Sequence, residues 1–376
     1  MQNEKALLSR YQLLCLGFIS LLSPIIRLLP QQSVIYASSA AWLSSLLSIV
    51  PIALLLCLSA WFLKNGEPNE GFAELFVKSL GRPLGKFILL TFSAWLIIYT
   101  AFSLRSQADR YIAAAYQFAS PPVFIVIMLI LALIAALGHF KALARTAQVF
   151  MPLLTLIIIL VFILSIRGMD TNFLQPVLSS DMRGVALGLI PIVNVLSVFV
   201  YFGFLEGLVG EKEGRSKTAF TWLAMMIIVV TLLCLTIVGT FGAELTTRLS
   251  YPFFAMIRNI RVFDFLERFE SIILALWVVS DFVFISILFF IIANNIRLCI
   301  GFPPSSDEKS RFFDFKNGRW IIWVCALVIL SASLSMAPDA DIFLRISTTI
   351  VPTINLGFTF LLIPLIVFIG KLRRKV

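Results

Sequence analysis

Six ionisable residues lie inside long apolar stretches of this sequence. They are Arg27, Arg105, Asp109, Arg110, Glu206 and Asp281. A charge at the depth of a lipid bilayer is costly unless it faces the interior of a helix bundle and meets a partner there. Such residues commonly mark the path of a substrate, an ion or a proton. These six positions are therefore the first places to look for function.

The spacing of these residues predicts which of them can pair locally. Arg105 and Asp109 are four residues apart, so they share a helix face and can form an ion pair. Asp281 has no cation within one helical turn, so its partner must be a distant residue, a bound cation or a proton. We expect Arg27, a sodium ion or a cationic ligand group to be within its reach. On this hypothesis Asp281→Asn removes a functional charge and leaves folding intact.

Residue types that most enzyme active sites need are scarce. His139 is the only histidine of the sequence, and no two of the five cysteines have the C-x-x-C spacing. A zinc site needs three or four nitrogen, sulfur or oxygen ligands, and a Ser-His-Asp triad needs an oriented imidazole. The sequence also has no P-loop and no G-x-G-x-x-G motif. We therefore expect no enzyme, no metal site and no cofactor.

The composition indicates an integral membrane protein. Hydrophobic residues make up 60% of the 376 residues, and only 30 Lys+Arg and 20 Asp+Glu are charged. Soluble domains are nearer to half apolar and a quarter charged. This composition excludes a cytosolic enzyme, a nucleic-acid-binding protein and a disordered protein.

Ten apolar stretches are long enough, at about 20 residues, to cross a bilayer as helices. They are Tyr11–Leu29, Ser38–Leu63, Lys86–Gln117, Pro121–Gly138, Ala147–Ile166, Gly184–Gly207, Thr218–Phe241, Ser271–Ile300, Arg319–Ala337 and Thr348–Gly370. The segments on the side of the termini hold 20 lysines and arginines, against 7 on the other side. This bias places both termini in the cytoplasm. If the first stretch were instead a cleaved signal peptide, nine spans would remain.

Ten spans divide into two halves of five, about 11–166 and about 184–337 with an extension to 370, within one membrane domain over residues 1–376. An odd number of spans per half gives the halves opposite orientations, as in an inverted repeat. The first helix of each half is interrupted, by Pro24 after Ser20 and Ser23, and by Gly203 within Tyr201–Gly207. Paired interruptions of this kind mark substrate sites in transporters. A simple proline kink and a small-residue packing motif at Gly203 and Gly207 remain alternatives.

The interrupted helices and the ionisable residues together define the candidate site. Its expected substrate-binding residues are Ser20, Ser23, Pro24, Arg27, Tyr99, Arg105, Asp109, Tyr201, Gly203, Glu206 and Asp281. We further expect the loop 242–270, outside the membrane, to be helical and to cover the mouth of the site, because its apolar residues have helical spacing after Pro252.

Several sequence patterns resemble those of one known family. The patterns are Tyr251-Pro252 followed by Arg258, Ile260, Phe265-Leu266-Glu267-Arg268, Glu270 and Trp277, with Ala41-Trp42-Leu43-Ser44, Arg105 and Gly203-Phe204 with Glu206 as further matches. Over essentially its whole length the chain resembles the spore germination permeases, the B subunits of nutrient germinant receptors. One departure is the first helix, where Ser23–Arg27 precedes Leu29-Pro30 in place of a glycine-rich stretch. Arg27 has no expected counterpart in the family.

This resemblance implies the amino acid–polyamine–organocation superfamily, a LeuT-like fold and the spore inner membrane. It also implies two partners, an A subunit and a C-subunit lipoprotein. The leading hypothesis is a receptor subunit that binds a nutrient, such as an amino acid, between helices one, three, six and eight. An autonomous amino-acid transporter coupled to protons or sodium through Asp281 is a second hypothesis. A structural subunit with a degenerate pocket is a third.

Overall fold

The computed structural model describes residues 8–67, 70–114, 119–138, 140–175, 182–209, 213–259, 269–301, 319–336 and 340–373. Within these ranges the chain is helical and has no β-strand; one isolated bridge joins Leu8 and Val209. The expected all-α class is confirmed for this part of the chain. His139 lies outside the described residues.

The helices follow one another closely along the sequence. The α-helices are α1 (Arg10–Ala37), α2 (Ala41–Leu47), α3 (Ile49–Lys64), α4 (Phe72–Leu80), α5 (Arg82–Ala114), α6 (Pro121–Leu137), α7 (Phe140–Ser165), α8 (Met182–Ser197), α9 (Arg215–Arg248), α10 (Pro252–Asn259), α11 (Phe269–Ile300), α12 (Arg319–Ser335), α13 (Ala340–Arg345), α14 (Val351–Leu356) and α15 (Ile363–Leu372). The 3₁₀ segments are η1 (Ser38–Ala40), η2 (Ile166–Gly168), η3 (Thr171–Leu174) and η4 (Val198–Leu208). The π-helical segments are η5 (Ile346–Ile350) and η6 (Gly357–Leu362).

Seven helical stretches of the described chain are long and apolar enough to cross a membrane. They are Arg10–Lys64, Arg82–Ala113, Phe140–Gly168, Met182–Leu208, Arg215–Arg248, Ile273–Ile300 and Ile346–Leu372. The first of them contains α1, α2 and α3, and two shorter apolar helices are Pro121–Leu137 and Trp320–Ser335. The protein is therefore an integral membrane protein, as its composition predicts.

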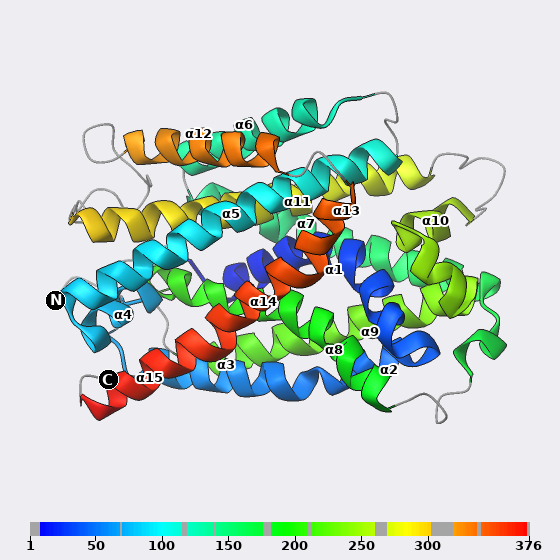
Figure 1. Ribbon diagram of the computed structural model, residues 1–376, viewed down its shortest axis with the longest axis horizontal. Helices are drawn as coiled ribbons and strands as arrows, with labels where there is room; N and C mark the ends of the chain where they lie inside the picture. Colours follow the sequence, from blue (N-terminus) through cyan, green and yellow to red (C-terminus); the bar gives the residue numbers. More distant parts are fainter. Residues whose placement is uncertain are drawn as a thin grey trace.

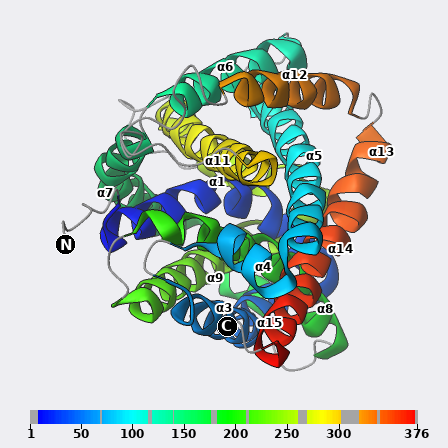
Figure 2. The same cartoon turned by 90° about the vertical axis from the view of Figure 1, so that its left-hand side faces the viewer.

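Helix α1 lies at the centre of the bundle. It packs against α7, α8, α9 and α11, and α5 packs against α11, α6 and α12 on one side of it (Figure 2). Both termini lie at one end of the long axis, and α10 lies toward the other (Figure 1). Most of α1 is buried, because it has apolar residues around its whole circumference.

Outer helices expose apolar faces of the kind that lipid requires. On α6 the side chains of Val123, Ile127, Ile130 and Ile134 are half exposed or more. Their spacing of four, three and four residues places them on one face of the helix. A continuous exposed apolar stripe is unusual in a soluble protein but is what a lipid-facing helix presents.

In the loop 242–270, residues 242–248, 252–259 and 269–270 are helical, and residues 249–251 are not. Gly242 has a φ of 71° inside α9, so this helix changes direction just after Phe241, where the seventh span was predicted to end. Helix α10 then packs Phe253 and Phe254 against Trp277 of α11, with ring centroids 5.1 and 4.9 Å apart. Residues 260–268, which complete the predicted helical loop, lie outside the described residues.

Candidate functional site

The interruption of α1 is bridged by a side chain of α11. Ser23 N–H donates a hydrogen bond to Ser280 Oγ at 3.0 Å, and the Ser280 hydroxyl donates to the carbonyl of Ile19. An ideal helix would join Ser23 N–H to this same carbonyl directly. Ser280 is therefore inserted into the backbone ladder of α1, one residue before Pro24. Helix α1 stays continuous from Arg10 to Ala37, so the break that the sequence predicted at Pro24 is reduced to this bridged hydrogen bond.

Asp281 pairs with Arg110, a residue of α5. The two side chains are fully buried, and Tyr111 Oη donates to Asp281 Oδ2 at 2.6 Å. Ser23 Oγ donates to Asp281 Oδ1 and accepts a hydrogen bond from Arg110 Nη1 at 2.6 Å. The partner of Asp281 is thus a distant residue, one of the alternatives that the sequence left open, but it is Arg110 and not Arg27. The sequence separation of 171 residues explains why spacing alone missed this pair.

Arg27 lies one helical turn beyond Ser23 on the same face of α1. Its side chain is buried, with the residue only 5% exposed, and neither its Nε nor its Nη1 has a hydrogen-bond partner. It is within electrostatic range of Arg110, Asp281, Tyr99 and Tyr251. We call Ser23, Arg27, Arg110, Tyr111 and Asp281 the charged cluster.

Arg105 and Asp109 form the ion pair that their spacing predicted. Arg105 Nε lies 3.1 Å from Asp109 Oδ1, and the two side chains are 18% and 28% exposed. Tyr99, two turns earlier on α5, is buried, with its ring 5.9 Å from the ring of Trp95 and 6.1 Å from that of Phe284. Tyr99 belongs to the aromatic core, within electrostatic range of Arg27.

The second interruption is a change of helix type. The segment η4 is an 11-residue 3₁₀ helix, much longer than such helices usually are, and its residues up to Glu206 are buried. A Cβ at Gly203 would lie only 2.3 Å from the ring of Phe72, so Gly203 allows η4 to approach α4 closely. This contact supports the alternative in which Gly203 serves packing.

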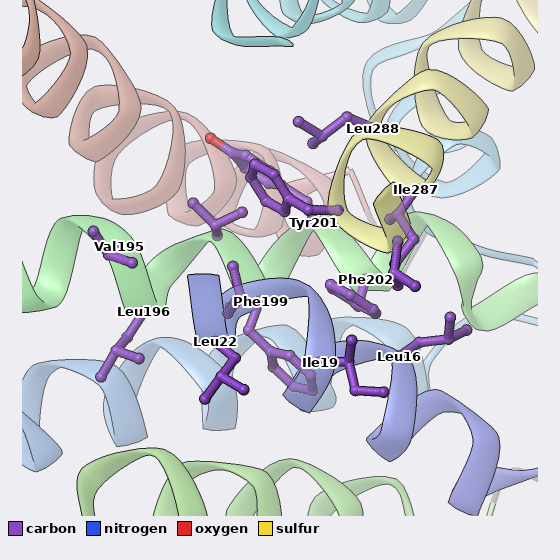
Figure 3. Close-up of a cluster of buried hydrophobic side chains, with 14 of the residues drawn as sticks. Leu16, Ile19, Leu22, Val195, Leu196, Phe199, Tyr201, Phe202, Ile287 and Leu288 are labelled. Carbon is purple, nitrogen blue, oxygen red and sulfur yellow. The ribbon is translucent and has the colours of Figure 1, made fainter. Parts of the chain in front are cut away.

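The two interrupted helices contact each other through apolar side chains. Figure 3 shows Ile19 and Leu22 of α1 beside Phe199 of η4, with Tyr201 directed away from them. A Cβ at Gly17 of α1 would lie 2.3 Å from the Phe199 ring, which confirms the close approach. At this level α1 and η4 therefore pack directly against each other.

Tyr201 belongs to a second polar cluster. Its hydroxyl donates to Asn355 Oδ1, and Asn355 Nδ2 donates to the carbonyl and the side-chain oxygen of Asn194, both at 2.9 Å. Thr359 Oγ1 lies 3.5 Å from Ser197 Oγ. We call Asn194, Ser197, Tyr201, Asn355 and Thr359 the amide cluster. It lies beside two π-helical segments, η5 and η6, a local irregularity that is frequent at functional sites.

Glu206 lies apart from both clusters. Arg10 Nη1 donates to its two carboxylate oxygens at 2.8 and 2.7 Å, and Arg215 Nε donates to it at 3.0 Å. Leu8 N–H also donates to the carbonyl of Leu208 at 3.1 Å. Through Arg10 and Arg215, Glu206 therefore links the end of η4 to the beginning of α1 and to the beginning of α9. A cavity of about 40 Å³ beside it is lined in part by Phe72, Phe199, Gly203 and Glu206.

The structure thus brings together Ser23, Arg27 and Asp281 from the predicted set. Ser20 donates to Gly17 of its own helix at 3.3 Å, and Tyr201 and Glu206 have partners elsewhere. Sequence reasoning missed Ser280 and Tyr111, and it identified Arg110 without assigning it a role. A serine beside a buried aspartate was the signal that could have indicated Ser280.

Comparisons with known proteins agree with this architecture. The solved structure of a Na⁺-coupled sialic acid symporter superposes with a TM-score of 0.63 and 13% identity, covering 94% of this chain and 77% of that one. MhsT in complex with L-phenylalanine superposes with a TM-score of 0.58 and 13% identity, covering 95% and 99%. Both are LeuT-fold transporters, so the chain has a fold of this type.

The sequence itself matches proteins of spore germination. Spore germination protein KB of Bacillus subtilis (strain 168) is 24% identical over 99% of this chain and 96% of its own length. Spore germination protein A2 of the same organism is 23% identical, and the match spans 62% of this chain and 64% of that protein. The profile of the family described as "Spore germination protein" matches residues 7–341. The chain therefore belongs to the spore germination permease family.

Proposed function

We propose that this protein is the nutrient-sensing membrane subunit of a spore germinant receptor. Its ligand is a small molecule, such as an amino acid, bound between α1, α5, η4 and α11. The observation that carries the proposal is the bridge from Ser280 into α1, because it joins the turn of α1 before Pro24 to the buried Arg110–Asp281 pair. A ligand that favours one arrangement of this bridge shifts the equilibrium between conformations.

The proposed topology has ten spans in a 5+5 inverted repeat. The stretch Arg10–Lys64 counts as two spans because Ser38, with a φ of 51°, separates α1 from the helices after it. The two shorter apolar helices, Pro121–Leu137 and Trp320–Ser335, complete the set with the other six long stretches. The bias of lysine and arginine toward the side of the termini supports a cytoplasmic location for both ends.

The proposed partners follow from the family. A receptor of this kind would join the chain to an A subunit and a C-subunit lipoprotein in the spore inner membrane. Tagging this chain in sporulating cells and identifying the subunits that co-purify from spore membranes tests this assembly. Purification of the chain without either partner would count against a receptor and in favour of an autonomous transporter.

A coupled transporter is the second candidate, because the fold is that of a sodium-coupled symporter. Against coupling through Asp281, its two oxygens already accept from Ser23, Arg110 and Tyr111. Uptake of a labelled nutrient by proteoliposomes that contain only this protein, driven by a sodium or proton gradient, would establish transport and displace the receptor hypothesis.

The variant Ser280→Ala tests the bridge directly. It removes the partner that Ser23 N–H and the Ile19 carbonyl share, and the two groups can bond each other only if α1 straightens; each buried group left unsatisfied costs about 1–3 kcal/mol. Because 1.4 kcal/mol corresponds to about a tenfold change in an equilibrium, the nutrient dose that gives half-maximal germination should shift at least tenfold. Ser286→Ala is the matched control, since Ser286 is buried on the same helix but bonds only its own backbone at Phe282. Equal dose responses in the two variants would reject the proposal.

A further inference from the structure

The charged cluster carries a surplus positive charge. Arg27 and Arg110 are both buried cations, whereas Asp281 is the only acid of the cluster. Asp281 is engaged by Arg110, so its charge does not neutralise Arg27 as well. A buried cation with no counter-charge is strongly disfavoured, which is why such groups are normally paired. Two guanidinium nitrogens of Arg27 have no hydrogen-bond partner. They can therefore donate to an anion that supplies the counter-charge.

The acids near Arg27 are already committed. Asp281 Oδ1 accepts from Ser23, and its Oδ2 accepts from Arg110 and Tyr111. Asp109, which is within electrostatic range of Arg27, accepts from Arg105 at 3.1 and 3.2 Å. A ligand ammonium group would therefore have to displace an arginine from a carboxylate, whereas a ligand anion would meet unpartnered donors.

Further polar groups of α5 face the same region. Tyr99, Ser103, Gln107 and Arg110 follow one another at intervals of four, four and three residues, so they lie along one face of the helix. Both ends of this row, Tyr99 and Arg110, are within electrostatic range of Arg27. Gln107 between them is buried, and its Oε1 has no hydrogen-bond partner. Polar groups with unfilled hydrogen-bonding capacity therefore continue from Arg27 along this face of α5. Such an arrangement is expected where a ligand completes the hydrogen bonding.

We propose that Arg27 is the anion-binding residue of this site and that the ligand bears a net negative charge, as an organic carboxylate does. The inference rests on the proposed function and specifies the ligand class of the same site. The guanidinium is permanently charged, and its Nε and Nη1 offer unpartnered donors on two edges of its plane, so an anion can accept a charge-assisted hydrogen bond from either. Zwitterionic amino acids, which bring an ammonium group as well, fit the charge balance less well.

Thermal unfolding of the purified protein with a ligand panel tests this inference. The panel contains sodium acetate, L-lactate and succinate as carboxylates, sodium chloride as an inorganic anion, L-alanine as a zwitterion and glucose as a neutral compound, all at constant ionic strength. We expect at least one carboxylate to raise Tm with a saturable dose dependence, and L-alanine and glucose to leave it unchanged. Stabilisation by L-alanine without any by the carboxylates would overturn the inference. A full effect of chloride alone would also overturn it, because the anion would then be inorganic.

Two variants of Arg27 separate binding from structure. Arg27→Gln should abolish the stabilisation by the carboxylate and raise Tm of the ligand-free protein, because it removes an uncompensated buried charge. Arg27→Lys keeps the charge but replaces the planar guanidinium donors with a single ammonium group, so the apparent Kd should weaken at least tenfold in a protein that still folds. Arg248→Gln is the control, since Arg248 is exposed and pairs with Glu244 on α9. If Arg27→Gln lowered the ligand-free Tm and Arg27→Lys bound the carboxylate as the parent does, Arg27 would be a structural residue and the inference would fail.

The receptor proposal has a separate readout. Co-purification with the A and C subunits does not depend on which ligand stabilises the isolated chain. Failure of the ligand panel with intact co-purification would reject the carboxylate and retain the receptor. Loss of co-purification with a normal panel result would retain the carboxylate site and reject the receptor.

Discussion

The charged cluster and the amide cluster are both buried among apolar helices, but they differ in charge. In the amide cluster, neutral groups of α8, η4 and α14 satisfy one another, with Asn355 donating to Asn194 and accepting from Tyr201. In the charged cluster, the bonds of Asp281 are complete but Arg27 remains without a counter-charge.

This difference separates two uses of polar residues inside a membrane protein. A complete neutral network needs nothing from outside, and it fixes the relative positions of the helices that contribute to it. A network with one charge too many is stable only with an additional partner or at a cost in folding energy. Sites that bind ligands are where such a cost is retained. We therefore expect the amide cluster to hold its helices in place, and we expect the proposed ligand to bind at the charged cluster.

Breaking the Arg110–Asp281 pair should have the largest effect. Asp281→Asn leaves Arg110 as a second buried cation beside Arg27, and removing one partner of a buried pair typically costs about 3–5 kcal/mol. We expect a large fall in protein level and in Tm, contrary to the expectation from sequence that this substitution leaves folding intact. Fluorescence-detected gel filtration of the solubilised protein with a thermal ramp measures both quantities.

The double variant Arg110→Met/Asp281→Asn provides the control for that prediction. It removes both charges, so it should recover a substantial part of the stability that Asp281→Asn loses. A double variant no more stable than the single one would show that the two side chains do not act as a pair. Normal protein levels of Asp281→Asn would show that Arg110 remains stable in the folded protein without its carboxylate partner. The charged cluster would then not differ from the amide cluster in the cost of an unpaired charge.

In the amide cluster, Asn355→Leu should have a smaller effect that is confined to stability. The substitution keeps the volume but leaves Tyr201 Oη and the Asn194 side chain without their partner, at a cost of about 1–3 kcal/mol. Tm should fall, while stabilisation by the carboxylate should be unchanged because Arg27 is untouched. Thr353→Ala is the control on the same helix, since Thr353 is exposed and bonds only the carbonyl of Thr349. An altered ligand response in Asn355→Leu would make the amide cluster part of the binding site.

The parts of the architecture that depend on local sequence were predictable. Apolar stretches located the helices, and the four-residue spacing of Arg105 and Asp109 gave their ion pair. Proline at position 24 and glycine at position 203 marked the two irregular helices, although α1 proved to be bridged rather than unwound. The physical reason is that helix formation and its interruption depend on residues within about one turn.

The parts that depend on helix rotation and packing were not predictable. Arg110 meets Asp281 only because α5 and α11 turn these faces toward each other, and no spacing within either helix encodes that. Ser280 was overlooked because a buried serine usually bonds its own helix, as Ser286 does. Asn194 and Asn355 were overlooked because uncharged amides attract less attention than ionisable groups in an apolar stretch. Each missed residue acts across two helices.

The smallest effect is expected outside the membrane, where the half-buried carboxylate of Glu74 has no ion-pair partner among the described residues. Glu74 of α4 accepts a hydrogen bond from Gly71 N–H at 3.0 Å, and burial, with a further contribution from Glu70, raises its pKa above the ordinary value of 4.5. A raised pKa means that the folded state binds this proton more tightly than the unfolded state does. The contribution to stability is therefore fully present below pH 4.5 and is lost as pH rises through the raised pKa.

Glu74→Gln tests this sign. Glutamine keeps the side-chain oxygen that caps α4 but cannot ionise, so Tm of the variant should fall less than that of the parent between about pH 4.5 and pH 7. Melting curves across this range measure the difference, with Glu213→Gln, at an exposed position just before α9, as the control. The same pH profile in Glu74→Gln and the parent would mean that this carboxylate is hydrated as well in the folded protein as in the unfolded one. The contrast between satisfied and unsatisfied polar groups would then apply only inside the helix bundle, where Arg27 is buried from water.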